Sequence, residues 1–194
     1  EWWDPAEQHF YWRDDIYNTF YFQEGVNSVY AILGQTWKGL EAQAGVRGEH
    51  THTVLRSSVA GADRVKNRFE FFPSLHVGYT FPKEHRLLAS YSRRTTRPQL
   101  FYMEPYITYR DFYTAEIGNP DIRPEYINSF ELNYRKGFGE NSVSATAFHR
   151  YRKDKIERLR VPFTAGVTLD SMANVGHDYS TGVEISLNLR LLRW

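Results

Sequence analysis

The sequence contains no cysteine, which excludes disulfide bonds and thiolate metal sites. It also lacks any run of about 18 apolar residues, the length that a membrane-spanning helix needs. That absence leaves membrane strands open, because a barrel strand needs only about 9–11 residues. The formal net charge of +1 gives no long-range field that would attract nucleic acid. Composition therefore excludes a helical membrane span and disfavours a nucleic-acid partner.

Motifs of enzymes and metal sites are missing as well. No Ser-His-Asp elbow, phosphate-cradling glycine loop or His-Glu-x-x-His helix occurs, so we expect neither enzymatic activity nor a cofactor. His50 and His52 would share one strand face, as metal ligands can, but they have no third ligand nearby and we expect a rim position. The pair Asp14-Asp15 would point to opposite faces of an extended chain, which argues against an acid/base dyad.

Aromatic residues, in contrast, are abundant, with 14 Tyr, 13 Phe and 5 Trp, and apolar residues alternate with polar ones along several segments. A period of two places the two sets on opposite faces of a strand. The last such segment alternates Val183, Ile185, Leu187, Leu189 and Leu191 with Glu184, Ser186, Asn188 and Arg190. The pattern predicts an all-β protein whose strands have one apolar and one charged face.

Seven long strands follow from this pattern, at residues 17–33, 39–54, 66–81, 86–97, 125–137, 141–160 and 167–192. Tight turns are expected at 34–38, 82–85 and 136–141, long loops at 55–65 and 98–124, and a shorter tip at 162–166. Short turns on one side and long loops on the other are typical of an outer-membrane β-barrel with its short turns in the periplasm. Residues 17–194 are therefore predicted to be part of an antiparallel transmembrane β-barrel, and residues 1–16 an extracellular loop or strand lead-in.

Two further expectations concern the faces of these strands. Aromatics at the short turns, namely Trp37, Phe81 and Phe138, with Trp194 at the chain end, would form an interfacial girdle. Apolar side chains should face lipid: Leu40, Ala42, Ala44, Val46, Leu75, Val77, Tyr79, Leu132, Tyr134, Ile185, Leu187 and Leu189. Charged side chains should face the lumen: Glu41, Arg47, Glu131, Arg135, Glu184 and Arg190.

Two rival architectures remain open at this point. A soluble carbohydrate-binding β-sandwich also alternates, although its strands usually run five or six residues. A small passive barrel or adhesin would need an even number of strands, and an eighth within residues 1–16 would supply it. The chain begins Glu1-Trp2 without an initiator Met, and we expect it to be a piece of a longer protein.

From residue 86 onward the sequence resembles the barrel of TonB-dependent receptors, in the outer-membrane β-barrel family. Three segments carry the resemblance, in the family's order: Leu88-Ala-Ser-Tyr-Ser-Arg-Arg-Thr-Thr-Arg-Pro98, Gly118-Asn-Pro-Asp-Ile-Arg-Pro-Glu125, and Asn174-Val-Gly followed by Gly182-Val-Glu-Ile-Ser186. In the second segment we expect Gly118 to take a positive φ and the prolines to stiffen a loop that re-enters a strand at Glu125.

The resemblance implies active uptake at the bacterial outer membrane. In this family a barrel of about 22 strands surrounds a plug, as in other plugged barrels of that size. A scarce nutrient, such as a metal chelate, vitamin, glycan or peptide, is captured by extracellular loops, and the TonB complex acts on the plug. No plug occurs in this sequence, so the implied partners are outer-membrane lipid, the small ligand and TonB acting through a plug outside this chain.

Two groups of residues are candidates for ligand contact. The long loop 98–124 is rich in aromatics, and Tyr102, Tyr106, Tyr109, Arg110 and Tyr113 are predicted to line the outer vestibule. These aromatics could equally pack the loop onto its own barrel. The second group is Arg93, Arg94 and Arg97, which would either pair with the lumen carboxylates Glu49, Glu131 and Glu184 or contact ligand directly.

Overall fold

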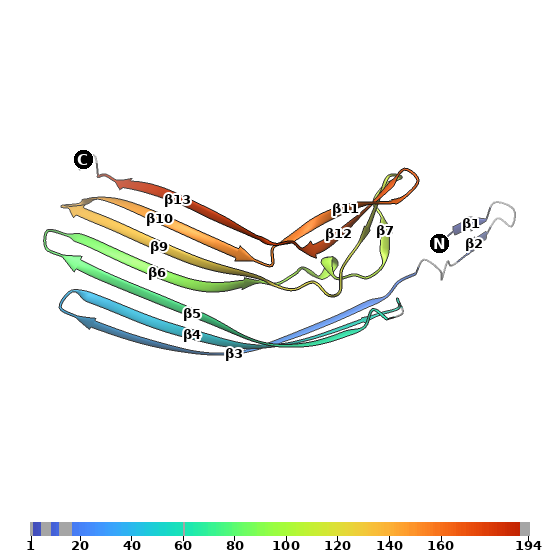
Figure 1. Ribbon diagram of the computed structural model, residues 1–194, viewed down its shortest axis with the longest axis horizontal. Helices are drawn as coiled ribbons and strands as arrows, with labels where there is room; N and C mark the ends of the chain where they lie inside the picture. The colour runs from blue at the N-terminus through green and yellow to red at the C-terminus, as the bar shows by residue number, and fades with distance from the viewer. Residues whose placement is uncertain (1, 5–8, 12–16, 60, 191–194) are drawn as a thin grey trace.

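The computed structural model describes residues 2–4, 9–11, 17–59 and 61–190, and its strands fall into three sheets (Figure 1). The smallest sheet pairs β1 (Trp2–Asp4) with β2 (His9–Tyr11). The remainder of 1–16 lies outside the described residues, as do Asp14, Asp15, Leu191 and Trp194. The expectation of a loop or strand lead-in over residues 1–16 therefore stays a prediction.

The main sheet has seven antiparallel strands. Their order in the sheet is their order along the chain, and each strand is hydrogen-bonded to the strands next to it. It runs in the order β3 (Phe20–Trp37), β4 (Leu40–Ser57), β5 (Arg64–Phe81), β6 (His85–Thr96), β9 (Glu125–Phe138), β10 (Asn141–Lys153) and β13 (His177–Asn188). The prediction of an all-β chain built on seven long antiparallel strands is confirmed.

Tight turns join the strands at one end of this sheet. Lys38 and Gly39 have φ angles of 46° and 86°, and Lys83 and Glu84 have φ angles of 65° and 62°. Adjacent residues with positive φ match the right-handed twist of the flanking strands. The predicted turn at 34–38 is wrong in position, because β3 continues to Trp37 before the chain reverses.

A second sheet stands at the other end, in the order β11 (Ile156–Thr164), β12 (Val167–Asn174), β8 (Thr114–Ile117) and β7 (Ile107–Tyr109). The unbroken strands predicted over 141–160 and 167–192 are therefore wrong. Each is interrupted, at Asp154 with φ 56° and at Gly176 with φ 59°. The register nevertheless continues through the break, since Lys153 faces His177 and Ile156 faces Asn174. Pro162 lies within β11, so the predicted tip at 162–166 is shorter than expected.

The register of the main sheet assigns each side chain to one of its two faces, because residues directly opposite each other on adjacent strands point to the same face. One such row is Ala44, Leu75, Tyr91, Phe130 and His149. All residues predicted to face lipid, except Leu189, fall on this face. The charged residues Glu41, Arg47, Glu131, Arg135 and Glu184 fall on the opposite face. Leu189 and Arg190 follow the last residue of β13, so the ladder does not place them.

Aromatic side chains mark two levels on the apolar face. Trp37, Phe81 and Phe138 lie beside the tight turns, and Phe71 and Phe130 lie further along the strands. From Phe81 to Phe71 a strand rises roughly 33 Å. At a tilt near 40° this is about 25 Å along the barrel axis, the height of the apolar band of a membrane barrel. The strands continue beyond Phe71 and so exceed the length that such a band requires.

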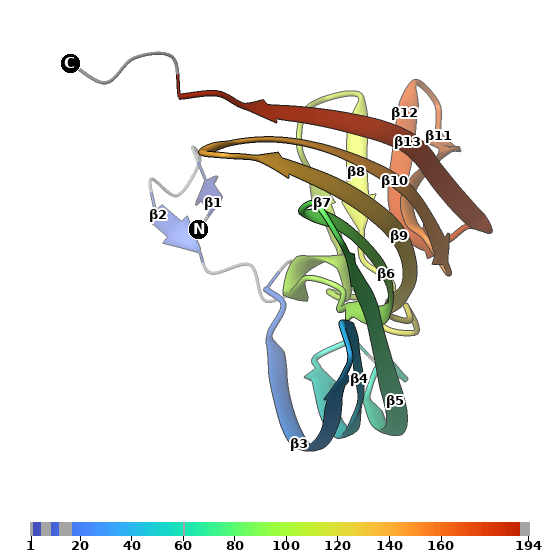
Figure 2. The same ribbon diagram turned by 90° about the vertical axis from the view of Figure 1, so that its left-hand side faces the viewer.

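The main sheet is a curved wall with residues 98–124 on its concave side (Figure 2). These residues pack against Leu55, which belongs to the polar face, so the polar face is the inner side of the wall. At its outer end it is covered by the segment 98–124, called the strap below, which contains the 3-10 helix η1 (Leu100–Tyr102) as well as β7 and β8. A core of Leu55, Met103 and Ile122 forms beneath the strap, with Phe20 and Phe22 packed against it. No helix among the described residues has the length and apolar character to cross a membrane.

The assignment of the two faces can be tested by spin labelling, since the sequence has no cysteine to interfere. We expect a label at Ala44→Cys to collide preferentially with oxygen, which concentrates in lipid. A label at the adjacent Gln43→Cys should collide preferentially with a water-soluble nickel chelate. The measurement is collision-dependent saturation of the full-length protein in bilayers. Equal preferences at the two positions would show that the wall does not separate lipid from water.

Candidate functional site

The Gly118–Glu125 segment closes the strap on itself and fixes it to the wall. It begins with a close approach of two backbones within the strap. The amide of Gly118 donates to the carbonyl of Glu104 (2.8 Å). A Cβ at Gly118 would lie 2.5 Å from the Glu104 nitrogen and 2.6 Å from its oxygen, so no other residue fits. The expectation of a positive φ at Gly118 is wrong, because the glycines with positive φ are others. Glycine is required here for space.

The next residues of this segment bind strand β5 on one side of the strap. The Asp121 carboxylate receives two hydrogen bonds from the guanidinium of Arg64 (2.8 and 3.0 Å). Lys66 donates to the carbonyl of Pro120 (2.5 Å). Hydrogen bonding from Arg64 holds the pKa of Asp121 below its usual value, with burial acting in the opposite direction. Asp121 is therefore ionised at neutral pH and ties the strap to the wall.

The other side of the strap is held by Asn174, which belongs to a second segment of the resemblance. The Asn174 side chain accepts from the amide of Arg123 (2.8 Å) and donates to the carbonyls of Arg123 (2.9 Å) and Asp154 (2.8 Å). Arg123 also pairs with the Asp154 carboxylate (3.0 Å). The two motifs, far apart in sequence, thus bind each other where β10 and β13 are interrupted.

A cavity of about 250 Å³ lies between η1 and the second sheet. Of the five loop residues predicted to contact ligand, Tyr102, Tyr106 and Arg110 line this cavity. Tyr109 and Tyr113 are outside its lining and exposed, at 62% and 72%. Tyr102 also packs against the core beneath the strap, so it combines both roles that the sequence left open. Burial, with a hydrogen bond to Glu104, raises the pKa of Tyr106, so its hydroxyl stays protonated.

The floor of this outer cavity is a chain of ion pairs that the sequence did not reveal. Arg110 pairs with Glu116 (2.5 Å), which also pairs with Arg158 (3.2 Å). Arg158 in turn reaches Asp170 (3.3 Å), a side chain only 2% exposed. Arg160 clamps the same carboxylate at 2.6 and 2.8 Å. Hydrogen bonds from Arg160 hold the pKa of Asp170 below its usual value, with burial opposing them.

The sequence does not predict these ion pairs, because β11 and β12 continue the alternation of the barrel strands that precede and follow them. One signal was present, since Arg158 and Arg160 alternate with Leu159 and Val161 beyond the length that a bilayer needs. The pairing of β8 with β12 is parallel and joins distant segments, which no local pattern indicates.

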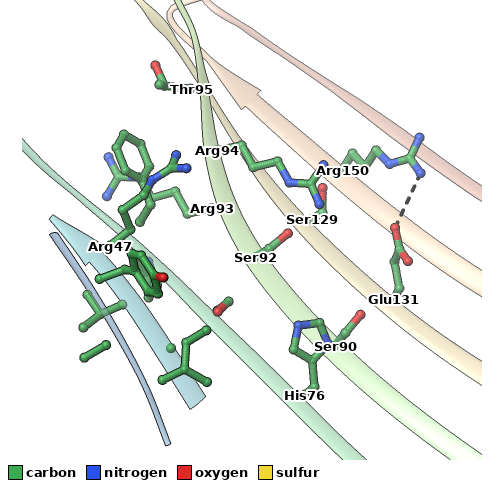
Figure 3. Close-up of a pocket in the computed structure, with 18 residues that line it drawn as sticks. Arg47, His76, Ser90, Ser92, Arg93, Arg94, Thr95, Ser129, Glu131 and Arg150 are labelled. Atoms are coloured by element: carbon green, nitrogen blue, oxygen red, sulfur yellow. Dashed lines mark hydrogen bonds and ion pairs between the residues drawn. The ribbon is translucent and has the colours of Figure 1, made fainter. Parts of the chain in front are cut away.

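A larger groove of about 700 Å³ lies lower on the inner face (Figure 3). The β5–β6 ladder ends at Ser74 opposite Ser92, immediately before Pro73, which has no amide to donate. The two strands part there, and the groove occupies the gap. Its charged lining consists of Arg47, Arg93, Arg94, Arg150 and Glu131, accompanied by Ser90, Ser92 and Ser129. A proline within a strand was the sequence signal for this groove.

The arginines predicted either to pair with carboxylates or to touch ligand divide between these two possibilities. Arg97 pairs with Glu49 (2.5 Å), a carboxylate 6% exposed that also pairs with Arg47 (2.9 Å). Arg93 stacks over the ring of Tyr126 at 5.0 Å. Arg94 makes no hydrogen bond or ion pair within the described part of the chain, and its guanidinium points into the groove (Figure 3).

The other charged residues predicted for the lumen lie in local contacts. Glu41 pairs with Arg86 (2.6 Å), Glu131 with Arg150 (3.5 Å) and Arg190 with Glu140 (3.0 Å). Arg135 donates to Ser142 (3.4 Å), and Glu184 lies opposite Thr146. The register places Glu41, Glu131, Arg135 and Glu184 on the inner face, and contact with a solute stays a prediction.

His50 and His52 lie on the outward face. His50 stacks on Phe69 (4.5 Å between centroids), and His52 shares a hydrogen bond with Asn67 (2.8 Å). Among the residues that the structure describes, no group of three His, Cys, Asp or Glu side chains is placed to hold a metal ion.

Comparisons with known proteins were made on sequence and on structure. The model of the "Outer membrane protein beta-barrel family" matches residues 4–194. A comparison with curated proteins gave no match. Among solved structures, the hemophore receptor HasR of Serratia marcescens, in complex with its hemophore and heme, superposes with a TM-score of 0.70 at 13% identity, covering 84% of this chain and 31% of HasR.

Two receptors of Pseudomonas aeruginosa are similar as well. The siderophore receptor PirA has a TM-score of 0.62 at 15% identity, covering 91% of this chain and 41% of PirA. The ferric enterobactin receptor PfeA has a TM-score of 0.59 at 17% identity, covering 98% of this chain and 36% of PfeA. At these identities the likeness shows the fold, and the chain spans less than half the length of each receptor.

The clamp at Asn174 generates a stability prediction. Asn174→Ala removes three hydrogen bonds and leaves backbone groups of Arg123 and Asp154 without a partner. Each such loss typically costs about 1–3 kcal/mol when the group is buried. We expect hydrogen exchange at the Arg123 amide to accelerate about tenfold or more in the full-length protein. Asn188→Ala, near the far end of β13, is the control, and unchanged exchange in Asn174→Ala would contradict the clamp.

The lowered pKa of Asp170 generates a pH prediction. A carboxyl group whose pKa is lower in the folded than in the unfolded protein stabilises the fold at pH values above its pKa in the unfolded protein. That contribution is lost as the pH falls through the folded value, which lies below the ordinary 3.8. We expect a spin label at Leu159→Cys to become more mobile below about pH 4 in the full-length protein.

In Asp170→Asn the label should be mobile already at neutral pH, with little further acid response. A label equally mobile at both pH values in the otherwise unchanged protein would show that Asp170 does not hold the second sheet.

Proposed function

Because this chain belongs to the outer membrane protein β-barrel family, and so to the bacterial outer membrane, we propose that it is part of a TonB-dependent uptake receptor. In this proposal the seven strands of the main sheet are a section of the wall of a larger barrel. The strap and the second sheet are the extracellular part that captures a scarce nutrient. The outer-membrane assignment leaves no place for the soluble sandwich alternative.

The observation that carries the proposal is the strap itself. It lies across the inner face of the wall and brings Tyr102, Tyr106 and Arg110 around a cavity at the outer end. Aromatics and arginine are the residue types that dominate binding energy at recognition surfaces. A loop that serves only to connect two strands needs neither the buried core beneath it nor anchors on both sides.

The polar inner wall supports import rather than adhesion alone. Arginines and serines line a groove that lies below the outer cavity, on the same face of the sheet. A solute released from the cavity would meet hydrophilic side chains on its way inward. HasR and PirA, which share this fold, are described as receptors for a heme-loaded hemophore and for a siderophore. For the present chain we propose a metal chelate, vitamin, glycan or peptide.

A passive barrel or adhesin is the alternative, and energy dependence separates the two. A passive barrel conducts its solute without an energised inner membrane. A TonB-dependent receptor still binds its ligand when the proton gradient is collapsed, but it does not import it. Import that continues unchanged after addition of a protonophore would support the passive alternative.

The ligand role is tested by substitutions in the intact receptor. We expect Tyr106→Ala to weaken ligand affinity and uptake about tenfold or more, because aromatic hot spots contribute about 2 kcal/mol or more. Arg110→Gln should have a similar effect. Tyr113→Ala, exposed and outside the cavity, is the matched control and should change uptake little. Affinity, uptake and surface abundance are scored separately.

Tyr102→Ala is less informative, because Tyr102 also supports the core of the strap and its loss should lower stability. Normal uptake at normal abundance in Tyr106→Ala and Arg110→Gln would remove the binding role and leave this loop structural.

A further inference from the structure

The inner wall carries two neighbouring cavities whose linings share three residues. The groove of about 700 Å³ and a second cavity of about 440 Å³ are both lined by Arg94, Ser129 and Arg150. These residues come from the adjacent strands β6, β9 and β10. In Figure 3 the Arg94 side chain extends toward Ser129, with Arg150 beyond it. The three side chains therefore form one polar point between the two cavities.

Positive charge exceeds negative charge around this point. The second cavity is lined by Arg94, Arg150 and Arg152 but by a single carboxylate, Asp178. Asp178 is already shared between Lys155 (3.1 Å) and Arg152 (3.6 Å). On the side of the larger groove, the described lining contains one carboxylate, Glu131, and its contact with Arg150 is long, at 3.5 Å.

Two arginines of the groove, Arg93 and Arg94, have no ion pair among the described residues, whereas Arg47, Arg97 and Arg152 each have at least one. Arg93 stacks over the ring of Tyr126, so Arg94 is the one of the two whose guanidinium has neither a carboxylate nor a ring partner among these residues. A guanidinium offers several donors in a planar fork that matches two oxygens of a carboxylate or phosphate. The Ser129 hydroxyl next to it supplies a further donor, and the Arg150 guanidinium a second positive charge.

We propose that Arg94, Arg150 and Ser129 form a binding site for an oxyanion, a carboxylate or phosphate group carried by the solute that passes along the inner wall. The inference rests on the proposed import function and narrows its substrate class to solutes with such a group. Charge complementarity favours this occupant, because an uncharged solute leaves the surplus of positive charge uncompensated. The parting of β5 and β6 at Pro73 provides the space in which the solute lies.

The test measures binding of two simple oxyanions, citrate and inorganic phosphate, to the full-length protein by calorimetry. We expect Arg94→Gln to weaken binding about tenfold or more, the usual effect of losing a charge-assisted hydrogen bond. Arg94→Lys should retain part of the affinity, because it keeps the charge and loses the fork. Preference for citrate assigns the site to carboxylates, and preference for phosphate assigns it to phosphoryl groups.

Arg86→Gln is the matched control. Arg86 lies on the same strand and the same face as Arg94, but Glu41 already neutralises it at 2.6 Å. Its substitution should leave oxyanion affinity unchanged. An equal loss in Arg86→Gln would overturn the site, because the effect would then reflect overall charge.

Two further results would also overturn the inference. One is the absence of oxyanion binding to the unsubstituted protein. The other is a lowered melting temperature of ligand-free Arg94→Gln, which would show that a carboxylate of the protein itself occupies the site. Uptake of the natural solute is scored separately, so energised uptake in either case would leave the proposed receptor function intact.

Discussion

Within a bilayer no water is available to satisfy the peptide backbone, so each amide and carbonyl must find a partner inside the protein. The main sheet meets this constraint with tight turns at one end and with ladders that are continuous from β3 to β5 and from β9 to β10. The β5–β6 ladder ends at Ser74, where the strands part at the polar groove of the inner face. The interruptions at Asp154 and Gly176 lie beyond the Phe71–Phe130 level, outside the apolar band. The strands can deviate only where water reaches them.

On the inner face the same chain is free to use charge. Here the strap is held mainly by hydrogen bonds and ion pairs. The apolar core between the strap and the wall is small, and its buried members are Leu55, Met103 and Ile122. Arg64–Asp121 on one side and Asn174–Arg123 on the other fix it across the wall. Since the partners are short-range and directional, they determine where the strap lies as well as how firmly it is held.

The sequence predicted the main sheet well, because a period of two is a direct consequence of a wall between lipid and water. Leu75, Val77 and Tyr79 could be assigned to one face from their spacing alone. The second sheet could not be predicted in this way, since β11 and β12 continue the same alternation after leaving the barrel sheet. Only the positive φ angles at Asp154 and Gly176 separate the two parts, and an aspartate gives little warning of such a conformation.

The candidate site divides along similar lines. Tyr102, Tyr106 and Arg110 were found because an aromatic-rich loop of that length is unusual. Asp170 and Arg158 could not be predicted because they reach the cavity from another hairpin, which a parallel pairing of β8 with β12 brings to the strap. The same holds for Arg160, which holds the Asp170 carboxylate. Arg94 could be named from the sequence, but its lack of a counter-charge became visible only when the carboxylates around it were assigned to other partners.

The backbone contact between Gly118 and Glu104 closes the base of an excursion, residues 105–117, that contains β7 and β8. Below that base the chain continues directly to Asn119 and the clamp, and above it β8 is paired with β12. The entropic cost of closing a loop grows only slowly with the length of the loop. Residues can therefore be inserted into or removed from 105–117 at little cost in stability. The length and composition of this excursion can diversify while the barrel beneath keeps its register, which separates the evolution of selectivity from the evolution of the fold.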